Sequence, residues 1–199
     1  MMKLSREFYE RDTLLVAREL LGKHLVRSTP EGMTIGKIVE TEAYIGPDDA
    51  AAHTFRSLRS KRTEVAFGPG GFAYVYLIYG MYHCFNIVAN VAEKPEVVLI
   101  RALEPVDGLE LMMKRRKTDK IKNLCSGPGK LCVAMDITKR DNGVDLCGDS
   151  LYLTDGDPVP DENIATTPRI NIDYAGEAKN YPWRFVIKDN KFVSVKAPK

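Results

Sequence analysis

The segment VETEAY carries two carboxylates and a phenol at alternate positions, Glu40, Glu42 and Tyr44, which are side chains capable of acid–base catalysis. The β-branched residues around them predict a strand, and alternate residues of a strand project from the same face. Two carboxylates would therefore meet beside an aromatic ring, where mutual repulsion and desolvation could tune one of them toward general-base work near neutral pH. A solvated strand face is the alternative that these three residues leave open.

Tyrosine is concentrated in the run FAYVYLIYGMYHCFNIVAN, where Tyr74, Tyr76, Tyr79 and Tyr82 fall within nine residues. A tyrosine offers a flat ring that stacks on a base and a hydroxyl that binds a phosphate or a base edge. Tyr79 precedes Gly80 at the expected turn, so its ring could enter a base step vacated by a flipped nucleotide. A tyrosine-rich buried sheet is the alternative.

Three further polar residues are candidates for a binding site. His53, in DDAAAHTF, could stack on a ligand or form a hydrogen bond to it, and the Asn86 amide could discriminate between base edges. Arg101 follows the apolar run VVLI and is costly to bury unpaired, so it must find a carboxylate or a phosphate. Each could instead serve the fold alone.

The basic residues are unevenly placed, although the formal net charge is only +2. Two basic clusters and an acidic stretch at 141–162 stand out; the clusters are Arg56, Arg59, Lys61 and Arg62, and Lys114, Arg115, Arg116, Lys117, Lys120 and Lys122. One basic face would suit a polyanion docked on one side. Two solvated charged surfaces would give the same pattern.

The bulk composition is that of a globular protein. The 199 residues are 44% hydrophobic and 28% charged, which predicts a single domain over residues 1–199. The N-terminus has no signal-peptide pattern and no apolar run reaches about 18 residues, so we expect a cytoplasmic monomer without membrane contact. The four cysteines lack zinc-site spacing, so we expect neither a metal nor a disulfide.

Periodicity and turn residues predict the elements that must position these side chains. Helices are expected at 12–22, with Asp12 as its cap and Gly22 at its end, at 107–117, begun by Asp107, and at 126–135. Strands are expected at 24–27, 33–46, 72–90 with a turn at Gly80, 96–105, 150–155, 184–189 and 192–195. Because no βαβ repeat is visible, the prediction is an α+β fold around a mostly antiparallel sheet.

Four blocks in this order resemble one family: GKIVETEAYIGPDDAAAHTF, GGFAYVYLIYGMYHCFNIVAN, VVLIRALEPVDG and LCSGPGKLCVAM. They are similar to the successive signature blocks of the alkyladenine (3-methyladenine) DNA glycosylases, and the resemblance runs from about Arg18 to Val195. It implies a curved antiparallel sheet flanked by helices, and a monofunctional DNA glycosylase of base excision repair. Its partner would be double-stranded DNA with a damaged purine of the 3-methyladenine, 7-methylguanine, hypoxanthine and etheno-adenine class.

The resemblance also implies roles for the residues of the site. Glu42 would be the general base for the attacking water, and Arg101 would hold that water or a nearby phosphate. The base-binding pocket would consist of four residues: Tyr44, His53, Tyr76 and Asn86. Asn86 would lie where the 2-amino group of normal guanine clashes.

The DNA contacts follow from the same resemblance. Tyr79 would fill the gap left in the duplex. The backbone would be held by four residues: Arg62, Ser126, Gly127 and Lys130. No lysine is placed to attack the sugar, so we expect hydrolysis to an abasic site without strand cleavage and without a cofactor.

Two places depart from the pattern of the family. One is the segment RSLRSKRTEVAF, and the other is Gly129, where some relatives have a serine. Two rival hypotheses stay open at this point. One is a nucleic-acid binder without turnover. The other is a hydrolase of free nucleosides or another glycoside that uses Glu40 and Glu42 as a carboxylate pair.

Overall fold

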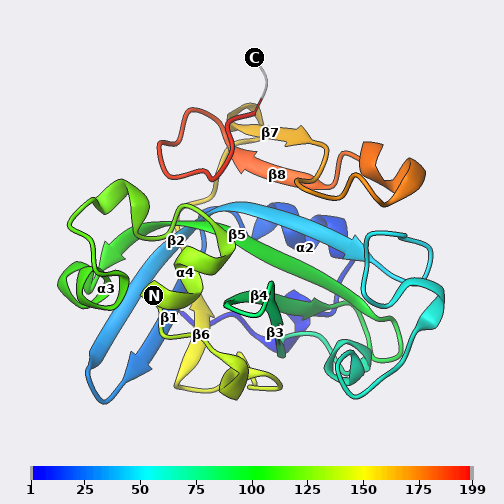
Figure 1. Cartoon of the computed structure of the whole chain (residues 1–199), viewed down its shortest axis with the longest axis horizontal. Helices are drawn as coiled ribbons and strands as arrows, with labels where there is room; N and C mark the ends of the chain where they lie inside the picture. Colours follow the sequence, from blue (N-terminus) through cyan, green and yellow to red (C-terminus); the bar gives the residue numbers. More distant parts are fainter. Residues whose placement is uncertain (1, 198–199) are drawn as a thin grey trace.

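The structure, a computed structural model, describes residues 2–197. Its strands form one antiparallel sheet in the order β3-β4-β5-β2-β1-β6, to which β8 and β7 are added beside β2 (Figure 1). The strands are β1 His24–Thr29, β2 Gly32–Ile45, β3 Ala73–Ile78, β4 Tyr82–Ala89, β5 Glu96–Asp107, β6 Leu151–Thr154, β7 Ile164–Thr167 and β8 Arg184–Ile187. The expected α+β class with a mostly antiparallel sheet is confirmed.

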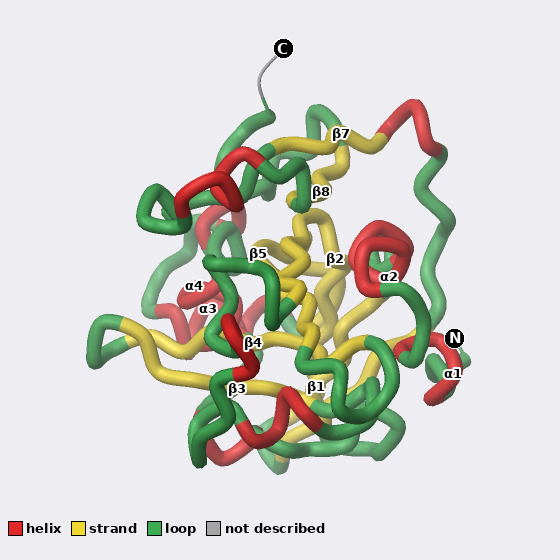
Figure 2. Tube along the Cα trace, turned by 90° about the vertical axis from the view of Figure 1, so that its right-hand side faces the viewer, coloured by secondary structure: helices red, strands yellow, loops and turns green. Residues whose placement is uncertain are grey.

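Helices are short and lie around this sheet. The α-helices are α1 Arg6–Tyr9, α2 Thr13–Glu19, α3 Leu109–Arg116 and α4 Pro128–Ala134. Single turns of 3-10 helix are η1 Phe55–Ser57, η2 Glu64–Phe67, η3 Ile121–Asn123, η4 Lys139–Asp141, η5 Asp161–Asn163 and η6 Gly176–Asn180. Figure 2 shows α2 on one side of β2 and β5, with α3 and α4 on the other, and the β3–β4 hairpin projecting from the body on the side of α3 and α4.

Strand β2 is the scaffold for the candidate site. Its first half pairs with β1, its second half pairs with β8 over Glu40–Glu42, and β5 follows its other edge from Ile35 to Ile45. The backbone at Glu40 and Glu42 is therefore held by hydrogen bonds from both sides. A strand fixed in this way aims its side chains with little freedom.

A β-bulge in β5 positions Arg101. Glu40 pairs with Ala102 and Thr41 pairs with Ile100, so Arg101 lies between them without a partner in the ladder. A bulge bends the strand locally and re-aims a side chain. Here it lets the Arg101 side chain reach Glu40 and Glu42, both on β2.

Helix α2 begins after Asp12, as predicted, but it ends at Glu19, three residues before the expected end at Gly22. The Asp12 carboxylate accepts a hydrogen bond from the Leu15 backbone N at 3.0 Å, and Gly22 follows the helix at φ +84°. Val16 and Ala17 are fully buried, whereas Leu15 is 41% exposed. The opposite face of β2 is anchored to this helix, because Thr41 Oγ1 donates to the Ala17 carbonyl at 2.7 Å.

Three expectations about elements are wrong. Residues 192–195 form no strand: Phe192 is buried against Val39 and Ala102, and Ser194 hydrogen-bonds to Glu40, so the apolar alternation serves packing instead. Strand β7 was not predicted. Strand β5 continues past Pro105 to Asp107, so helix α3 begins after Gly108, which has φ +70°, and not at Asp107.

Some properties concern the described chain as a whole. None of the helices in residues 2–197 has the length and apolar character that crossing a membrane requires. The same residues contain no group of three His, Cys, Asp or Glu side chains placed to hold a metal ion. Cys84, Cys125 and Cys132 are buried free thiols, and Cys147 is a partly buried one.

Candidate active site

Glu42 is a fully buried carboxylate with three hydrogen-bond donors. Oε1 accepts from the Ile170 backbone N at 2.8 Å, whereas Oε2 accepts from the Tyr44 hydroxyl at 2.8 Å and from Arg101 Nη1 at 3.3 Å. A carboxylate oxygen has two lone pairs, so Oε1 keeps one free to accept a proton. The arrangement suits a general base that is held in place by its own donors.

Glu40 lies on the same face as Glu42, as the strand prediction required, but its hydrogen bonds are with structural partners. Its Oε1 accepts from Arg101 Nε at 3.0 Å, Arg184 Nε at 2.8 Å and Ser194 Oγ at 2.9 Å. Its Oε2 accepts from the Ser194 backbone N at 2.6 Å. Glu40 therefore anchors Arg101, whereas Glu42 also contacts Tyr44 on the wall of the outer cavity.

Tyr44 is held from below by a buried ion pair. The guanidinium of Arg169 lies over the Tyr44 ring, with Cζ 4.7 Å from the ring centroid. The same guanidinium binds both oxygens of Asp49, at 2.5 and 2.8 Å, and both side chains have no exposed surface. Burial first, and then the charge of Glu42, raises the pKa of Tyr44 well above 10, so its hydroxyl remains a donor.

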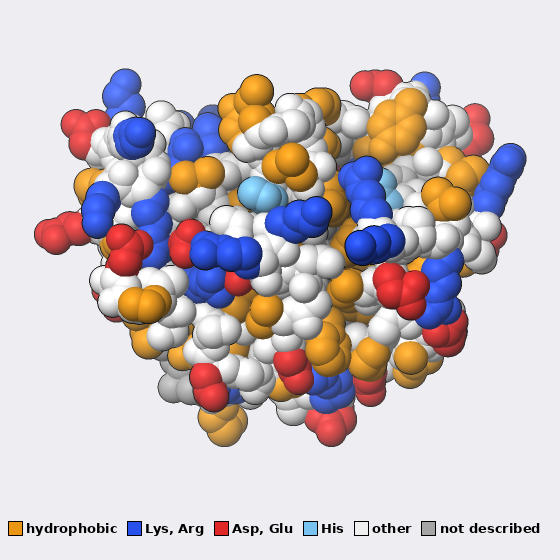
Figure 3. All heavy atoms as spheres, turned by 60° about the horizontal axis from the view of Figure 1, so that its bottom comes forward, with side chains coloured by type: hydrophobic (Ala, Val, Ile, Leu, Met, Phe, Trp, Pro, Cys, Tyr) orange, Lys and Arg blue, Asp and Glu red, His pale blue; other side chains and the backbone are white. Residues whose placement is uncertain are grey.

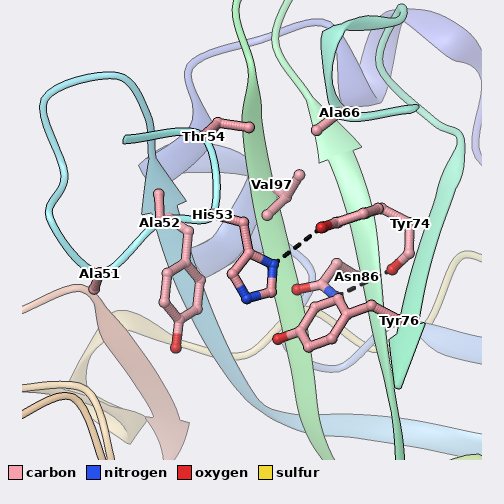
Figure 4. Close-up of a pocket in the computed structure, with 10 residues that line it drawn as sticks. Ala51, Ala52, His53, Thr54, Ala66, Tyr74, Tyr76, Asn86 and Val97 are labelled. Carbon is pink, nitrogen blue, oxygen red and sulfur yellow. Dashed lines mark hydrogen bonds between the residues drawn. The ribbon is translucent and has the colours of Figure 1, made fainter. Parts of the chain in front are cut away.

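His53 packs against two tyrosines of β3 (Figure 4). Its Nδ1 is 3.0 Å from the Tyr74 hydroxyl, and its ring contacts that of Tyr76 edge to face with 4.5 Å between centroids. Burial and then the nearby Arg62 guanidinium lower the pKa of His53 to about 4. The imidazole is therefore neutral at physiological pH, and no base fits between His53 and Tyr76 at their present separation.

Asn86 is on β4 behind these rings and is 1% exposed. Its Nδ2 donates to the Tyr74 carbonyl at 3.1 Å, as drawn in Figure 4. This bond fixes the orientation of the amide and turns its oxygen away from that carbonyl. The side chain thus satisfies a backbone group of the sheet and lines a cavity at the same time.

Two adjoining cavities share four lining residues: Tyr44, Ala51, His53 and Tyr76. The inner one, of about 20 Å³, also borders Tyr74 and Asn86 and has room for about one water molecule. The outer one, of about 260 Å³, also borders Arg101, Ile170 and Tyr79. Glu42 lies directly behind Tyr44, Arg101 and Ile170 and does not itself reach the surface of the outer cavity.

Tyr79 lies at the tip of the β3–β4 hairpin, as predicted. It is 78% exposed and has φ +53°, and Gly80 follows with φ +70°. A large apolar ring held out in water at the rim of a cavity is typical of a binding surface. The hairpin that carries it projects from the body of the protein (Figure 2).

The four residues expected at the DNA backbone lie in two places. Arg62 is exposed beside the pocket, with Cζ 5.2 Å from the Tyr76 ring centroid and Nη2 3.5 Å from His53 Nε2. Ser126, Gly127 and Lys130 are together at the start of α4, where Lys130 Nζ is 3.5 Å from Ser126 Oγ. Neighbouring Pro128 and Gly129 line the outer cavity.

Several residues of the two basic clusters are already paired inside the protein. Arg59 binds Glu64 and Glu93, and Arg115 binds Glu31 and the Ala134 carbonyl. Figure 3 shows Lys and Arg side chains in a band across one face, with hydrophobic and acidic side chains among them. The basic surface is therefore smaller than the sequence suggested.

Sequence reasoning missed the residues that hold the site from behind. They are Asp49, Arg169, Ile170, Arg184 and Ser194. Arg169 follows β7 and Arg184 begins β8. Both could have been questioned as Arg101 was, because a buried arginine requires a partner. Ile170 acts through its backbone N–H, which leaves no signal in the sequence.

Comparisons with known proteins identify the family of this chain. The family model described as methylpurine-DNA glycosylase matches residues 7–191. A protein of Alkaliphilus oremlandii is 52% identical over 98% of this chain and 100% of its own length, and one of Clostridium acetobutylicum is 52% identical over 98% of each chain. A protein of Bacillus cereus is 53% identical over 98% of this chain and 100% of its own length. All three bear the name "Putative 3-methyladenine DNA glycosylase".

The match extends over most of the chain and includes every element that builds the two cavities. The resemblance drawn from the four sequence blocks is thereby confirmed, and DNA is the partner that the family implies. The chain belongs to the methylpurine-DNA glycosylase family and is a hydrolase of N-glycosyl bonds.

Proposed function

We propose that this protein flips a damaged purine out of duplex DNA into the cavity beside Tyr44, His53 and Tyr76, and that Glu42 then drives hydrolysis of its bond to deoxyribose. The observation that carries the proposal is the Glu42 carboxylate, held by Tyr44, Arg101 and the Ile170 N–H with one lone pair of Oε1 free.

In the proposed reaction, Glu42 removes a proton from water as the water oxygen bonds to C1′ of the sugar. The C1′–N bond breaks, and its electron pair leaves with the base. A cationic base such as 3-methyladenine or 7-methylguanine departs as a neutral molecule. A neutral base such as hypoxanthine or etheno-adenine takes up a proton as it leaves, and the product is an abasic site in an unbroken strand.

Access to Glu42 requires movement of the cavity wall. The carboxylate has no exposed surface, and the inner cavity has room for about one water molecule. A flipped base must therefore displace aromatic side chains, and we propose that it enters between Tyr44 on one side and the His53–Tyr76 pair on the other. The Tyr79 ring would then fill the vacated base step.

Discrimination between purines would come from two features. The faces of Tyr44, Tyr76 and the neutral His53 ring are electron-rich, so they favour a cationic alkylated base. The oriented Asn86 amide lies at the inner end of the cavity, where the 2-amino group of guanine would clash. We propose 3-methyladenine, 7-methylguanine, hypoxanthine and etheno-adenine as substrates, bound by a cytoplasmic monomer that acts as one domain.

The test is base release from duplex oligonucleotides that carry one such lesion, followed by alkali to cleave at abasic sites. Wild type should release the base, and Glu42→Gln should slow release by roughly 10²- to 10⁴-fold, the usual contribution of a general base. Glu104→Gln is the matched control, because Glu104 pairs with Lys37 on the same sheet but borders neither cavity. Tight, salt-sensitive duplex binding without release from any lesion would replace the proposal with a binder that has no turnover.

A further inference from the structure

A second exposed aromatic ring, Tyr174, lies on the rim of the outer cavity. It belongs to the connection between β7 and β8 and is 73% exposed. It borders the same cavity as Tyr79 of the β3–β4 hairpin, which is 78% exposed. The cavity therefore has an exposed tyrosine on each of two separate elements.

The backbone that carries Tyr174 is firmly held. Ile172 and Ala175 on either side are 5% and 1% exposed, and they pack with Ala51 and Ala178 in a small apolar cluster. The Ala175 N–H donates to the Ile172 carbonyl at 2.9 Å, which closes the turn. Because Ile172, two residues before Tyr174, and Ala175, directly after it, are buried, the exposure of Tyr174 is a property of a fixed turn.

The same segment also reaches the floor of the site. The Ile170 N–H binds Glu42 Oε1 at 2.8 Å, and Asn171, with φ +59°, bends the chain directly afterwards toward the rim. Only three residues thus separate a donor to the candidate general base from the exposed ring of Tyr174. A ligand that rests on Tyr174 would also stabilise the position of Ile170.

We propose that Tyr174 is a second DNA-contacting residue at the mouth of the pocket. Its ring would pack on the sugar of the nucleotide next to the flipped one, and its hydroxyl would donate to the adjacent phosphate. Tyr79 would fill the duplex while Tyr174 holds the extruded strand. This inference rests on the proposed function, since it names a contact for the same duplex substrate.

The experiment measures single-turnover release of hypoxanthine from a duplex oligonucleotide, over a range of enzyme concentrations that separates binding from the maximal rate. Tyr174→Ala should raise the enzyme concentration that gives half the maximal rate by about tenfold, which is the effect of losing one hydrogen bond to a charged group. The value for Tyr174→Phe should fall between those of Tyr174→Ala and wild type. Tyr152→Ala, a partly buried tyrosine on β6, which is at the edge of the sheet remote from the pocket, is the control and should bind as wild type does.

Each outcome separates this inference from the proposed function. Release by wild type with equal half-saturation for wild type and Tyr174→Ala would overturn the contact while leaving the glycosylase proposal intact. A melting temperature of Tyr174→Ala well below that of wild type would assign the residue to the fold instead. No release by wild type from any lesion would overturn the proposed function itself. Weaker binding by Tyr174→Ala at an unchanged melting temperature supports the contact.

Discussion

The Arg101 guanidinium lies closer to Glu40 than to Glu42, and both carboxylates are buried. Its Nε is 3.0 Å from Glu40 Oε1, whereas its Nη1 is 3.3 Å from Glu42 Oε2. Both glutamates have fully buried side chains, and Arg184 supplies a second positive charge to Glu40. Two arginines therefore balance two buried carboxylates. Glu40 orients Arg101, and Arg101 in turn binds Glu42.

We predict that Arg101→Lys lowers both stability and base release. A lysine keeps the charge but lacks the planar fork that binds two carboxylates at once, so one buried carboxylate loses a hydrogen bond from a charged donor. We expect a loss of about 1 to 3 kcal/mol in the free energy of unfolding, measured by urea denaturation. Base release should slow by at least about tenfold.

The surface offers a matched control for that substitution. Arg59 also bridges two glutamates, Glu64 at 2.7 Å and Glu93 at 2.9 Å, but its side chain is 46% exposed. Arg59→Lys should leave the free energy of unfolding nearly unchanged, because exposed ion pairs contribute little. Equal losses for the two variants would contradict the role given to burial at Arg101.

A second prediction concerns the Tyr44 hydroxyl. Tyr44→Phe keeps the ring on the pocket wall and removes the 2.8 Å hydrogen bond to Glu42 Oε2. The maximal rate of base release should fall by about tenfold or more, since a hydrogen bond to a charged group contributes about 1.5 to 3 kcal/mol. The concentration that gives half the maximal rate should change little. Tyr44→Ala should impair both, and equal effects of the two variants would assign the whole contribution to the hydroxyl.

The third prediction is a pH dependence at His53, whose pKa is lowered to about 4 by burial and by Arg62. An unfolded histidine takes up its proton near pH 6.5, so between about pH 6.5 and 4 the unfolded state binds more protons than the folded one. His53 thus contributes stability above pH 6.5 that is lost as pH falls through this window. Imidazole ¹⁵N chemical shifts measured by NMR should show His53 neutral down to about pH 5.

Substitution of Arg62 tests what lowers the pKa of His53. Arg62→Gln removes the smaller of the two contributions, so the pKa of His53 should rise toward 6.5 without reaching it. Lys61→Gln, at the neighbouring exposed position, should leave the titration of His53 unchanged. A titration of His53 near pH 6.5 in the unmodified protein would contradict its packing against Tyr74 and Tyr76.

The sequence predicted the face of β2 and the hairpin, because both depend on local patterns. Glu42 and Tyr44 share a face through the period of two residues, and Tyr79 lies at a turn marked by Gly80. The partners of Glu42 could not be read in this way, since Ile170 is 128 residues away and contributes a backbone N–H. The bulge at Arg101 was equally hidden, because the local pattern of β5 fits a regular strand.

The C-terminal residues give an example in which a local pattern predicted an element that the structure does not have. The alternation at 192–195 predicted a strand, yet Phe192 packs on Val39 and Ser194 binds Glu40. Arg184 also donates to the Val195 carbonyl. The alternation at 192–195 reflects side-chain contacts with β2 and not hydrogen bonds between strands. Such long-range contacts override local propensity.

The last prediction concerns the buried pair of Asp49 and Arg169 beneath Tyr44. Asp49 also accepts hydrogen bonds from the Ile45 and Ala51 backbone N–H groups, so it joins the end of β2 to the loop that carries His53. Asp49→Asn would leave a buried guanidinium without a counter-charge, which costs about 3 to 5 kcal/mol. For a chain of this length the melting temperature should fall by roughly 6 to 20 °C.

The control for this prediction is Asp149→Asn, which removes the charge that pairs with Lys3 at a side chain that is 98% exposed. Its melting temperature should stay within about 2 °C of the wild-type value, because exposed pairs contribute little. Thermal unfolding followed by circular dichroism measures both variants. A small change for Asp49→Asn would mean that Arg169 is held by the Tyr44 and Trp183 rings and by the Ala43 and Ala178 carbonyls alone, and that the ion pair does not position the pocket wall.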